Sequence, residues 1–263
     1  MIFSKANSLN NGQLPLIPLH FQRFEFKYYL PETKADKIIP ALLNYMDWDP
    51  HTLGYGQDYY QVNSLYYDSP DYGCFWDKES GISDRKKLRF RYYSNDLAPD
   101  SPVFLEIKRK NDALVIKDRL QLKFADCLNS RLDNYLTALN SSVETAGLAS
   151  EISWFKKRNC LKPKLFVSYQ RKALISKRDK KFRVTFDYNI TTGLLENFNQ
   201  VPRQLKKVFP RTVVLELKFN NIMPGWFHKI IQKYQLQRLA YSKYCNCLRI
   251  AKPEFDDNNY NLN

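Results

Sequence analysis

Several short stretches of the chain alternate between apolar and charged residues. The clearest is residues 85–93, RKKLRFRYY, in which Phe90 separates Arg89 from Arg91. Because successive side chains of a strand point to opposite faces, this period of two predicts strands that carry charge on one face only. Eight stretches are predicted to be strands: residues 20–30, 59–67, 85–93, 103–109, 114–122, 164–175, 181–188 and 211–219.

Apolar residues at helical spacing lie between these strands. The predicted helices are residues 31–46, 72–76, 124–139, 143–159, 224–234 and 237–249. Pro40 lies inside the first of them and predicts a kink or a break there. Since the strands mostly follow one another as hairpins, with helices inserted between them, the pattern predicts an α+β protein built on one antiparallel sheet.

The charged faces of these strands allow two interpretations. In the first, an open amphipathic sheet turns its mixed charges to water. In the second, the sheet closes on itself with its charged side inward, and the lumen holds a highly charged linear anion. Cations in register favour the second, because they repel one another unless an anion lies between them. Three strands share the pattern Glu-apolar-Lys: Glu25-Phe26-Lys27, Glu106-Ile107-Lys108 and Glu216-Leu217-Lys218.

The charge balance points to an anionic partner. The 263 residues include 41 Lys and Arg against 27 Asp and Glu, which gives a net charge of +14. Nucleic acid, a membrane surface or a small polyanion would each suit this excess. The chain has no run of 18 apolar residues, so no membrane-spanning helix is expected. The 5 cysteines show no CxxC spacing, which favours a reducing compartment and a cytoplasmic protein.

Other kinds of active site find little support in the sequence. There is no Walker-type Gly-Lys-Ser loop and no GxSxG motif, so neither a P-loop nor a nucleophilic hydrolase is expected. The three histidines are isolated, which makes a His-based metal site improbable. Cys245 and Cys247 lie two apart on a predicted helix, where their side chains diverge, and we expect free buried thiols.

At the level of motifs, the chain resembles the polyphosphate polymerase domain of the vacuolar transporter chaperone (VTC) proteins, a branch of the triphosphate tunnel metalloenzymes. The resemblance extends from about residue 20 to 250 and rests on eight stretches in order: RFEFKYYL (23–30), YYDSPDYGCFWDK (66–78), RKKLRFRYY (85–93), VFLEIKRK (103–110), SYQRKAL (168–174), FRVTFDYNI (182–190), VVLELKF (213–219) and AYSKYCNCL (240–248). It implies an eight-stranded antiparallel closed β-barrel, with helices packed outside.

The resemblance also assigns roles to residues. The implied phosphate-binding, catalytic residues are Lys27, Arg89, Arg91, Lys108, Arg171, Arg183 and Lys243. Glu216 is expected to bind Mn2+ or Mg2+. The residues expected to help bind the substrate are Tyr169, Lys218, Ser242, Glu25 and Glu106. Glu25 and Glu106 could act as a base for water, or as partners that keep Lys27 and Lys108 in place; we favour the second role.

One position departs from the wider superfamily, whose first strand begins Glu-x-Glu-x-Lys. Arg23 stands at the first of these positions, so that only Glu25 and Lys27 remain. Fewer carboxylates mean fewer metal ligands, which favours the polymerase branch over hydrolases that use two metals and leaves the number of metals open.

The implied activity is transfer of the terminal phosphoryl group of a nucleoside triphosphate, ATP by expectation, onto inorganic polyphosphate. Alternatives on the same tunnel are a tripolyphosphatase or nucleoside triphosphate phosphohydrolase and a non-catalytic polyphosphate-binding module. A nucleic-acid binder with an exposed stacking face is a further alternative, but nucleic acid is not the expected partner. An unidentified partner protein that extracts the product remains open.

The expected organisation is a flexible leader over residues 1–19, a single tunnel domain over 20–250 and a flexible tail over 251–263.

Overall fold

The structure is a computed structural model that describes residues 20–54, 58–94, 96–111, 114–127, 131–139, 145–195, 202, 204–220 and 222–255. The expected leader, residues 1–19, lies outside the described residues, as do residues 256–263 of the expected tail.

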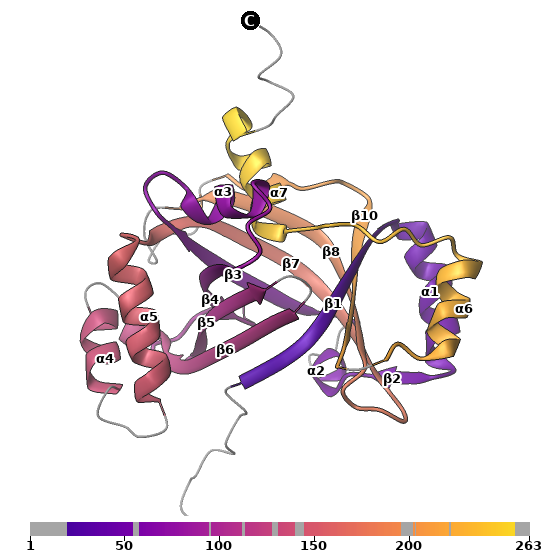
Figure 1. The fold of residues 1–263 in the computed structure, drawn as a ribbon. Coiled ribbons are helices and arrows are strands. Elements are labelled where there is room, and N and C mark those ends of the chain that lie inside the picture. Colours follow the sequence, from indigo (N-terminus) through magenta and orange to yellow (C-terminus); the bar gives the residue numbers. More distant parts are fainter. Residues whose placement is uncertain are drawn as a thin grey trace, which may run out of the picture.

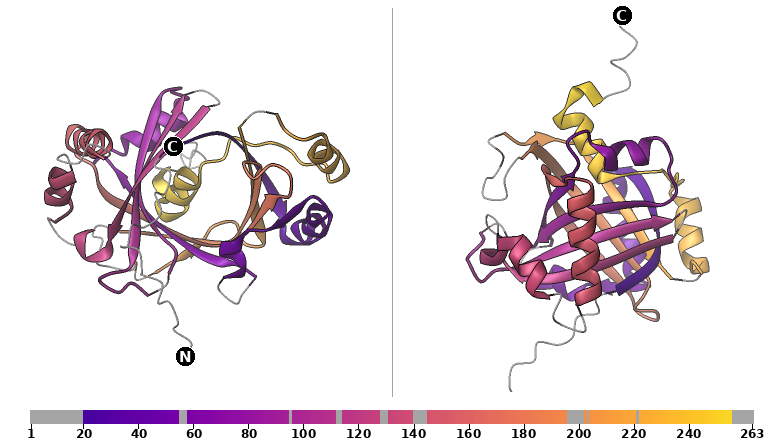
Figure 2. Two further views of the ribbon diagram at one scale, coloured as in Figure 1. Left: turned by 90° about the horizontal axis from the view of Figure 1, so that it is seen from below. Right: turned by 60° about the vertical axis from the view of Figure 1, so that its left-hand side comes forward.

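Eight strands form a closed antiparallel ring (Figures 1 and 2). Each predicted strand is present, with ends that shift by a few residues; β8 extends furthest beyond its prediction. Around the ring, the order is β7-β3-β4-β5-β6-β1-β10-β8, and β8 pairs with β7 to close it. The strands are β1(His20–Pro31), β3(Tyr60–Asp68), β4(Arg85–Tyr92), β5(Pro102–Asn111), β6(Leu114–Lys123), β7(Lys162–Ser176), β8(Arg183–Leu194) and β10(Thr212–Phe219).

The ring also carries short elements, most of which the sequence pattern did not predict. Two small strands, β2(Met46–Trp48) and β9(Lys206–Lys207), pair with β7 and β8 respectively. A four-residue helix, α2(Pro50–Leu53), follows β2, and a short 3-10 helix, η2(Pro253–Phe255), follows the last α-helix. A second 3-10 helix, η1(Phe124–Cys127), lies within the helix predicted over residues 124–139. Segments this short bury too few side chains to leave a periodic signal.

The apolar side of the ring faces outward, beneath helices. On one flank, Leu88, Phe90 and Ile107 are fully buried in a cluster completed by α4(Arg131–Leu139) and α5(Ala146–Arg158). On the other, α1(Glu32–Leu43) and α6(Gly225–Lys233) cover a cluster that includes Leu215 and Leu217. Each such side chain contributes about 1.5–3 kcal/mol on burial. The charged side therefore faces the lumen, and the open-sheet interpretation is wrong.

The helix α1 runs through Pro40 without the break that the sequence suggested. Pro40 itself is exposed, while Ile38, Ile39 and Leu42 are buried against the ring. Proline inside a helix costs about 3 kcal/mol, and the burial of this apolar face outweighs that cost.

The C-terminal helix differs most from the prediction. Helix α7(Lys243–Ala251) begins six residues later than the expected start at residue 237. Residues 238–242 instead run extended beside β1, where the Leu239 N–H donates to the Lys27 carbonyl at 2.9 Å. We call these five residues the strap. They lie against the part of β1 beyond Phe24, the last residue of β1 that pairs with β6.

Helix α7 lies at one end of the ring rather than outside it. Its Tyr244, Cys245 and Leu248 are buried with Tyr169 and Val214, which project inward from β7 and β10. Viewed end-on, the helix lies within the outline of the ring (Figure 2, left). The short helix α3(Gly73–Glu79) contacts α7 at the same end. The expectation that all helices pack outside therefore fails for α7, which narrows this end of the lumen.

Among the described residues, no helix is both long enough and apolar enough to cross a membrane. Cys245 and Cys247 are buried free thiols on α7, as predicted.

Candidate active site in the lumen

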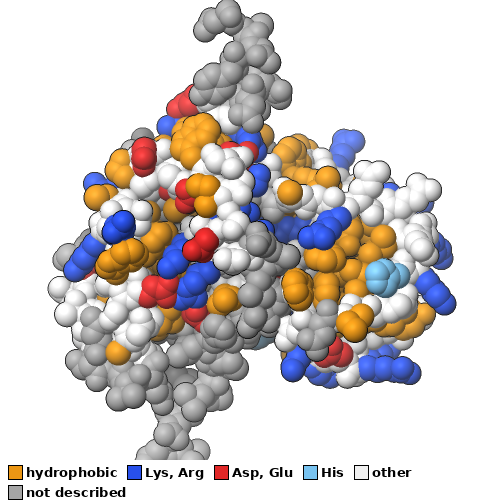
Figure 3. Space-filling model, in the orientation of Figure 1, with side chains coloured by type: hydrophobic (Ala, Val, Ile, Leu, Met, Phe, Trp, Pro, Cys, Tyr) orange, Lys and Arg blue, Asp and Glu red, His pale blue; other side chains and the backbone are white. Residues whose placement is uncertain are grey.

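A cavity of about 500 Å³ occupies the lumen. Its walls come from the inner faces of the strands, from the strap and from the start of α7. The basic residues that line it are Lys27, Lys78, Arg85, Lys87, Arg89, Arg91, Lys108, Lys110, Lys117, Arg171, Lys218, Arg238 and Lys243, whereas the acidic ones are Glu25 and Glu216. Basic side chains are also visible near the middle of the face in Figure 3, beneath α7.

The structure brings most of the predicted site residues together. Those that line the cavity are Glu25, Lys27, Arg89, Arg91, Lys108, Tyr169, Arg171, Glu216, Lys218, Ser242 and Lys243. Glu106 lies behind this surface, fully buried. Arg183 is not among the lining residues; its guanidinium pairs with Asp49 at the start of α2. Nothing in the geometry supports a phosphate-binding role for Arg183.

Glu106 anchors the arginines of β4. Arg89 approaches its carboxylate at 2.7 Å, Lys117 at 3.2 Å and Arg91 at 3.8 Å. Burial alone would raise the pKa of this carboxyl, but Lys117, Arg89 and Arg91 hold it well below its usual range. Glu106 therefore stays ionised and fixes the guanidinium of Arg89, which also donates to the Tyr66 hydroxyl at 3.0 Å.

The expected partners of Glu25 and Glu106 need correction. Both are ion-pair partners, but Glu25 pairs with Lys108, and Glu106 pairs with Arg89 and Lys117. Side chains two residues apart on a strand project in parallel, about 6.6 Å apart, whereas cross-strand neighbours lie closer. For these two motifs, therefore, the carboxylate contacts cations on other strands rather than the Lys of its own motif.

Asp187 forms a second buried anchor, beside the first residue of α7. Arg171 donates to it twice, at 2.6 and 2.8 Å, and Lys243 completes the cluster. Burial acts to raise the pKa of Asp187, but Arg171 and Lys243 outweigh it and lower the pKa. This fixes the fork of Arg171 and the ammonium of Lys243, which also lies 5.0 Å from the centre of the Tyr169 ring.

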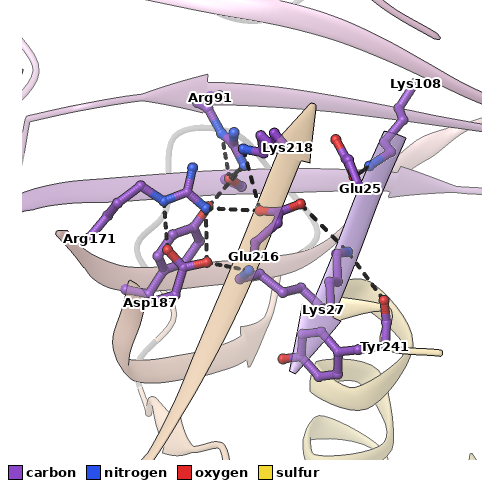
Figure 4. A network of polar contacts seen from close by, with 12 residues as sticks. Glu25, Lys27, Arg91, Lys108, Arg171, Asp187, Glu216, Lys218 and Tyr241 are labelled. Carbon is purple, nitrogen blue, oxygen red and sulfur yellow. Dashed lines mark hydrogen bonds and ion pairs between the residues drawn. The ribbon is translucent and has the colours of Figure 1, made fainter. Parts of the chain in front are cut away.

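Glu216 is held more loosely than the other lumen carboxylates. Its nearest cations are Lys218 at 3.4 Å, Arg171 at 3.5 Å and Lys27 at 3.9 Å (Figure 4). Burial alone would raise the pKa of Glu216, yet these cations and Lys243 hold it well below its usual range. Its oxygens are thus ionised and lack the close hydrogen bonds that hold Glu106 and Asp187.

This donor set bears on the expected metal. The described residues include no cluster of three or more His, Cys, Asp or Glu side chains that could hold a metal ion. Mg2+ and similar hard cations commonly bind one or two protein carboxylates and take their other ligands from phosphates and water. Glu216 fits that arrangement, and an all-protein metal cage does not fit this lumen.

Three lysines of the lumen, Lys108, Lys117 and Lys218, have lowered pKa values. Burial lowers the pKa of Lys108, although Glu25 opposes the shift. Burial lowers the pKa of Lys218 to about 7. Glu216 acts against this shift, and Arg171 adds to it. Burial, together with Arg91 and Arg89, lowers the pKa of Lys117 to about 8, with Glu106 opposing the shift. The lumen therefore contains more positive charge than its carboxylates neutralise, and it would gain from an anion.

The sequence-based assignments missed several lining residues. Arg85, Lys87 and Lys110 lie in the matching stretches and have the inward period of their strands, but the resemblance assigned no role to them. Lys117 alternates with Val115 on β6 and could have been found by the same rule. By the same alternation, Asp187 falls on the same face of its strand as Arg183, but only the fold brings it to Arg171.

A closed eight-stranded antiparallel barrel with a basic lumen defines the class of this protein as a triphosphate tunnel fold. Residues 22–252 match the family model described as the VTC domain, and the chain belongs to this family.

Solved structures with similar folds share little sequence with the chain. A candidate adenylate cyclase from Bacillus halodurans is 14% identical, with a TM-score of 0.48, and the match covers 86% of this chain and 96% of that one. A candidate adenylyl cyclase from Hippeastrum, described as having a dominant triphosphatase activity, is 12% identical over 84% of this chain and 93% of that one, with a TM-score of 0.46. The Mimivirus capping enzyme triphosphatase is 10% identical over 81% of this chain and 88% of that one, with a TM-score of 0.33. No match was found among curated proteins.

Proposed function

We propose that this chain is an ATP-dependent polyphosphate polymerase. In this reaction, the bond between the β- and γ-phosphates of ATP breaks, a new P–O–P bond forms at the end of a polyphosphate chain, and ADP leaves. The observation that carries the proposal is the lumen itself, whose lining is strongly basic while its buried carboxylates are held in ion pairs.

The arginines and lysines supply what phosphoryl transfer needs most, which is position and charge neutralisation. Arg89 and Arg171 have their planar forks fixed by Glu106 and Asp187 before any ligand arrives. Donors that are already oriented need no reorganisation as charge shifts during transfer. Arg91 and Lys243 lie beside them, so donor and acceptor phosphates would meet a preorganised set of cations.

The carboxylates of the lumen favour transfer to phosphate over hydrolysis. Attack by water benefits from a carboxylate base, whereas a terminal phosphate oxygen is already ionised at neutral pH. Neighbouring cations lower the pKa values of Glu25, Glu106 and Asp187, against the effect of burial. Such carboxylates are weak proton acceptors, which supports the polymerase over the hydrolase.

Glu216 would hold the divalent cation, Mn2+ or Mg2+, which when bound would neutralise phosphate charge and polarise the bond that breaks. Lys27, Lys218 and Arg171 lie around Glu216 and would bind the same phosphates directly.

The test is to incubate the purified protein with ATP and either Mn2+ or Mg2+ and to follow the products by phosphorus NMR and gel electrophoresis. A polymerase should give mid-chain phosphate signals and release one ADP for each phosphate added to the chain. Orthophosphate and ADP without chains would identify a hydrolase, and tight polyphosphate binding without turnover would identify a binding module. Either outcome would overturn the proposal. Arg91→Ala should abolish the signal, whereas Arg178→Ala, on the exposed β7–β8 hairpin, should not.

A further inference from the structure

Asp68 is a fully buried carboxylate that lies outside the lumen site. It ends β3, is 0% exposed and does not line the cavity. Unlike Glu106 and Asp187, it pairs with no lysine, arginine or histidine among the described residues. Burying a carboxylate without a cation is costly unless hydrogen bonds compensate. The groups that donate to Asp68 therefore show what it holds in place.

Asp68 joins the ends of three elements. It accepts hydrogen bonds from the backbone N–H groups of Ser69 at 2.8 Å, Cys74 at 2.8 Å and Phe75 at 3.2 Å, the last two in the first turn of α3. It also accepts from the Tyr244 hydroxyl of α7. Burial and the charge of Asp68 raise the pKa of Tyr244, so this hydroxyl keeps its proton and remains a donor. One carboxylate thus links the end of β3, the start of α3 and the first turn of α7.

The first turn of α7 carries groups of the active site. Tyr244 directly follows Lys243, whose ammonium pairs with Asp187 and lines the cavity. The centre of the Tyr244 ring lies 4.4 Å from the ammonium of Lys87 and 5.2 Å from the centre of the Tyr66 ring. Because consecutive residues of a helix keep a fixed angle to one another, any rotation of α7 that moves Tyr244 also moves Lys243.

Apolar packing alone does not fix the rotation of α7. Cys245 and Leu248 are buried beneath it, but hydrophobic contact has no direction. A hydrogen bond, by contrast, requires a narrow range of distance and angle. The Lys243–Asp187 pair is directional too, but it faces the lumen, where a bound phosphate would compete for the ammonium. Asp68 does not line the cavity, so no phosphate in the lumen competes for its contact with α7.

We propose that Asp68 is a positioning residue of the active site. By accepting the hydrogen bond from the Tyr244 hydroxyl, it fixes the rotation of α7 and directs the ammonium of Lys243 at the bound phosphates. Asp68 touches neither substrate nor metal and acts only through the helix. This inference rests on the proposed function, because it takes the phosphates of that reaction as the ligand of Lys243.

A double-mutant cycle tests whether Asp68 and Tyr244 act through Lys243. Tyr244→Phe removes the hydroxyl and keeps the ring, and it is made in the unaltered protein, in Lys243→Met and in Lys108→Met. Lys108 provides the control background, since Glu25 on β1 holds it. Calorimetry measures the affinity for tripolyphosphate, polymer formation gives kcat, and circular dichroism confirms that each variant is folded at the temperature used.

Two further variants separate the position of α7 from general stability. Tyr234→Phe removes a hydrogen bond between elements outside the ring, in which the hydroxyl donates to the Lys37 carbonyl at 2.9 Å. It should match the unaltered protein in affinity and in kcat. Asp68→Asn keeps the size of the side chain and alters the contact with Tyr244 from the other side. It is measured in the same three backgrounds, so that the test does not depend on a single substitution.

Tyr244→Phe should lower both the tripolyphosphate affinity and kcat about tenfold, because Lys243 is no longer directed at the phosphates. The same loss should appear in Lys108→Met. In Lys243→Met, the further loss should be less than about twofold, since the group that Asp68 positions is already gone. Asp68→Asn should give the same pattern across the three backgrounds.

Equal losses in all three backgrounds would overturn the proposal, because they would show that Asp68 supports the fold alone. Unchanged affinity and kcat in Tyr244→Phe would overturn it as well. Failure of the proposed function is distinct from both. A protein that shows the coupling in tripolyphosphate binding but makes no polymer keeps the positioning residue and loses the polymerase. A protein that makes polymer without the coupling keeps the polymerase and loses the positioning residue.

Discussion

Arg89 and Arg91 lie two residues apart on the same face of β4, yet their polar partners differ. Arg89 makes the closest contact to a fully buried carboxylate, that of Glu106. Arg91 lies 3.8 Å from the same group and donates mainly to the hydroxyls of Ser64 and Tyr169, at 3.2 Å each. The alternating pattern predicts their common direction, but only the fold reveals which of them neutralises buried charge.

Arg89→Ala should therefore destabilise the protein, whereas Arg91→Ala should not. Removing Arg89 leaves Glu106 with Lys117 and the more distant Arg91, at a cost of about 1–3 kcal/mol. Removing Arg91 leaves two neutral hydroxyls and relieves its repulsion with Arg89, so the free energy of unfolding should stay within about 1 kcal/mol. Both variants should lose at least about 100-fold in polymer formation. Urea unfolding beside the polymer assay measures both effects; equal stability losses would contradict the assigned anchor.

Glu216→Gln tests the carboxylate that remains most available in the lumen. The substitution keeps the size of the side chain and removes its charge, so the Mn2+ concentration needed for half-maximal activity should rise about tenfold or more. Without metal, tripolyphosphate should bind as well or better, because one negative charge has left the site. Metal titrations and calorimetry in chelator separate the two effects.

Glu25→Gln is the matched control, because it neutralises the other carboxylate of the lining, which Lys108 already holds. A similar shift in metal requirement for both variants would show that Glu216 has no special role.

At the scale of elements, alternation along the strands carries most of the information. All eight strands of the ring are predictable, and most of them have one apolar face beneath a helix and one charged face toward the lumen. Strand β3 instead turns the neutral Ser64 and Tyr66 toward the lumen arginines. The strap and the start of α7 are not predictable in this way. Residues 238–242 gain their extended form from contacts with Lys27 and Tyr28, some 200 positions earlier, which no local pattern contains. The registered cations favoured a closed sheet, but the number of strands in the ring became an expectation only through the resemblance.

Ser242 ends the strap and caps α7, because its hydroxyl accepts from the Cys245 N–H at 3.3 Å. Ser242→Ala should cost about 1 kcal/mol in the free energy of unfolding. Ser242→Asp keeps a good cap and should retain stability, but its charge faces the anion site and should weaken tripolyphosphate binding by about tenfold. Ser242→Thr should preserve both properties. Thermal unfolding and calorimetry check the three variants, and normal binding by the Asp variant would place Ser242 away from the phosphates.

At the scale of the whole molecule, closing the ring turns a solvated charged face into a confined one. Arg89, Lys117 and Lys218 come from three different strands and share one lumen. Water on an open sheet would screen these charges, whereas in the lumen burial and the neighbouring cations lower the pKa values of Lys117 and Lys218. The net charge of the sequence indicates an anionic partner, but only the closed geometry explains why a linear polyanion fits better than a flat surface.

The lowered pKa values of the lumen lysines also predict how the free energy of unfolding and the affinity for polyphosphate depend on pH. Lys218 has a pKa of about 7 in the folded protein and 10.5 as a free side chain. Between these values, the unfolded chain binds more protons than the native one, so this lysine makes stability rise with pH. Lys117, with a pKa of about 8, adds to the same trend above that pH.

Polyphosphate should reverse the shift, since an anion beside Lys218 restores its proton. Binding at pH 8–9 should therefore take up protons, and affinity should fall as the pH rises from 7 to 9. Calorimetry in buffers of different ionisation enthalpy measures the uptake, and thermal unfolding without ligand measures the stability trend. In Lys218→Met both effects should shrink, with stability at pH 7 equal or higher. If the unaltered protein binds polyphosphate without taking up protons, Lys218 and Lys117 are already charged before binding. The repulsion between the lumen cations would then not be strong enough to remove their protons.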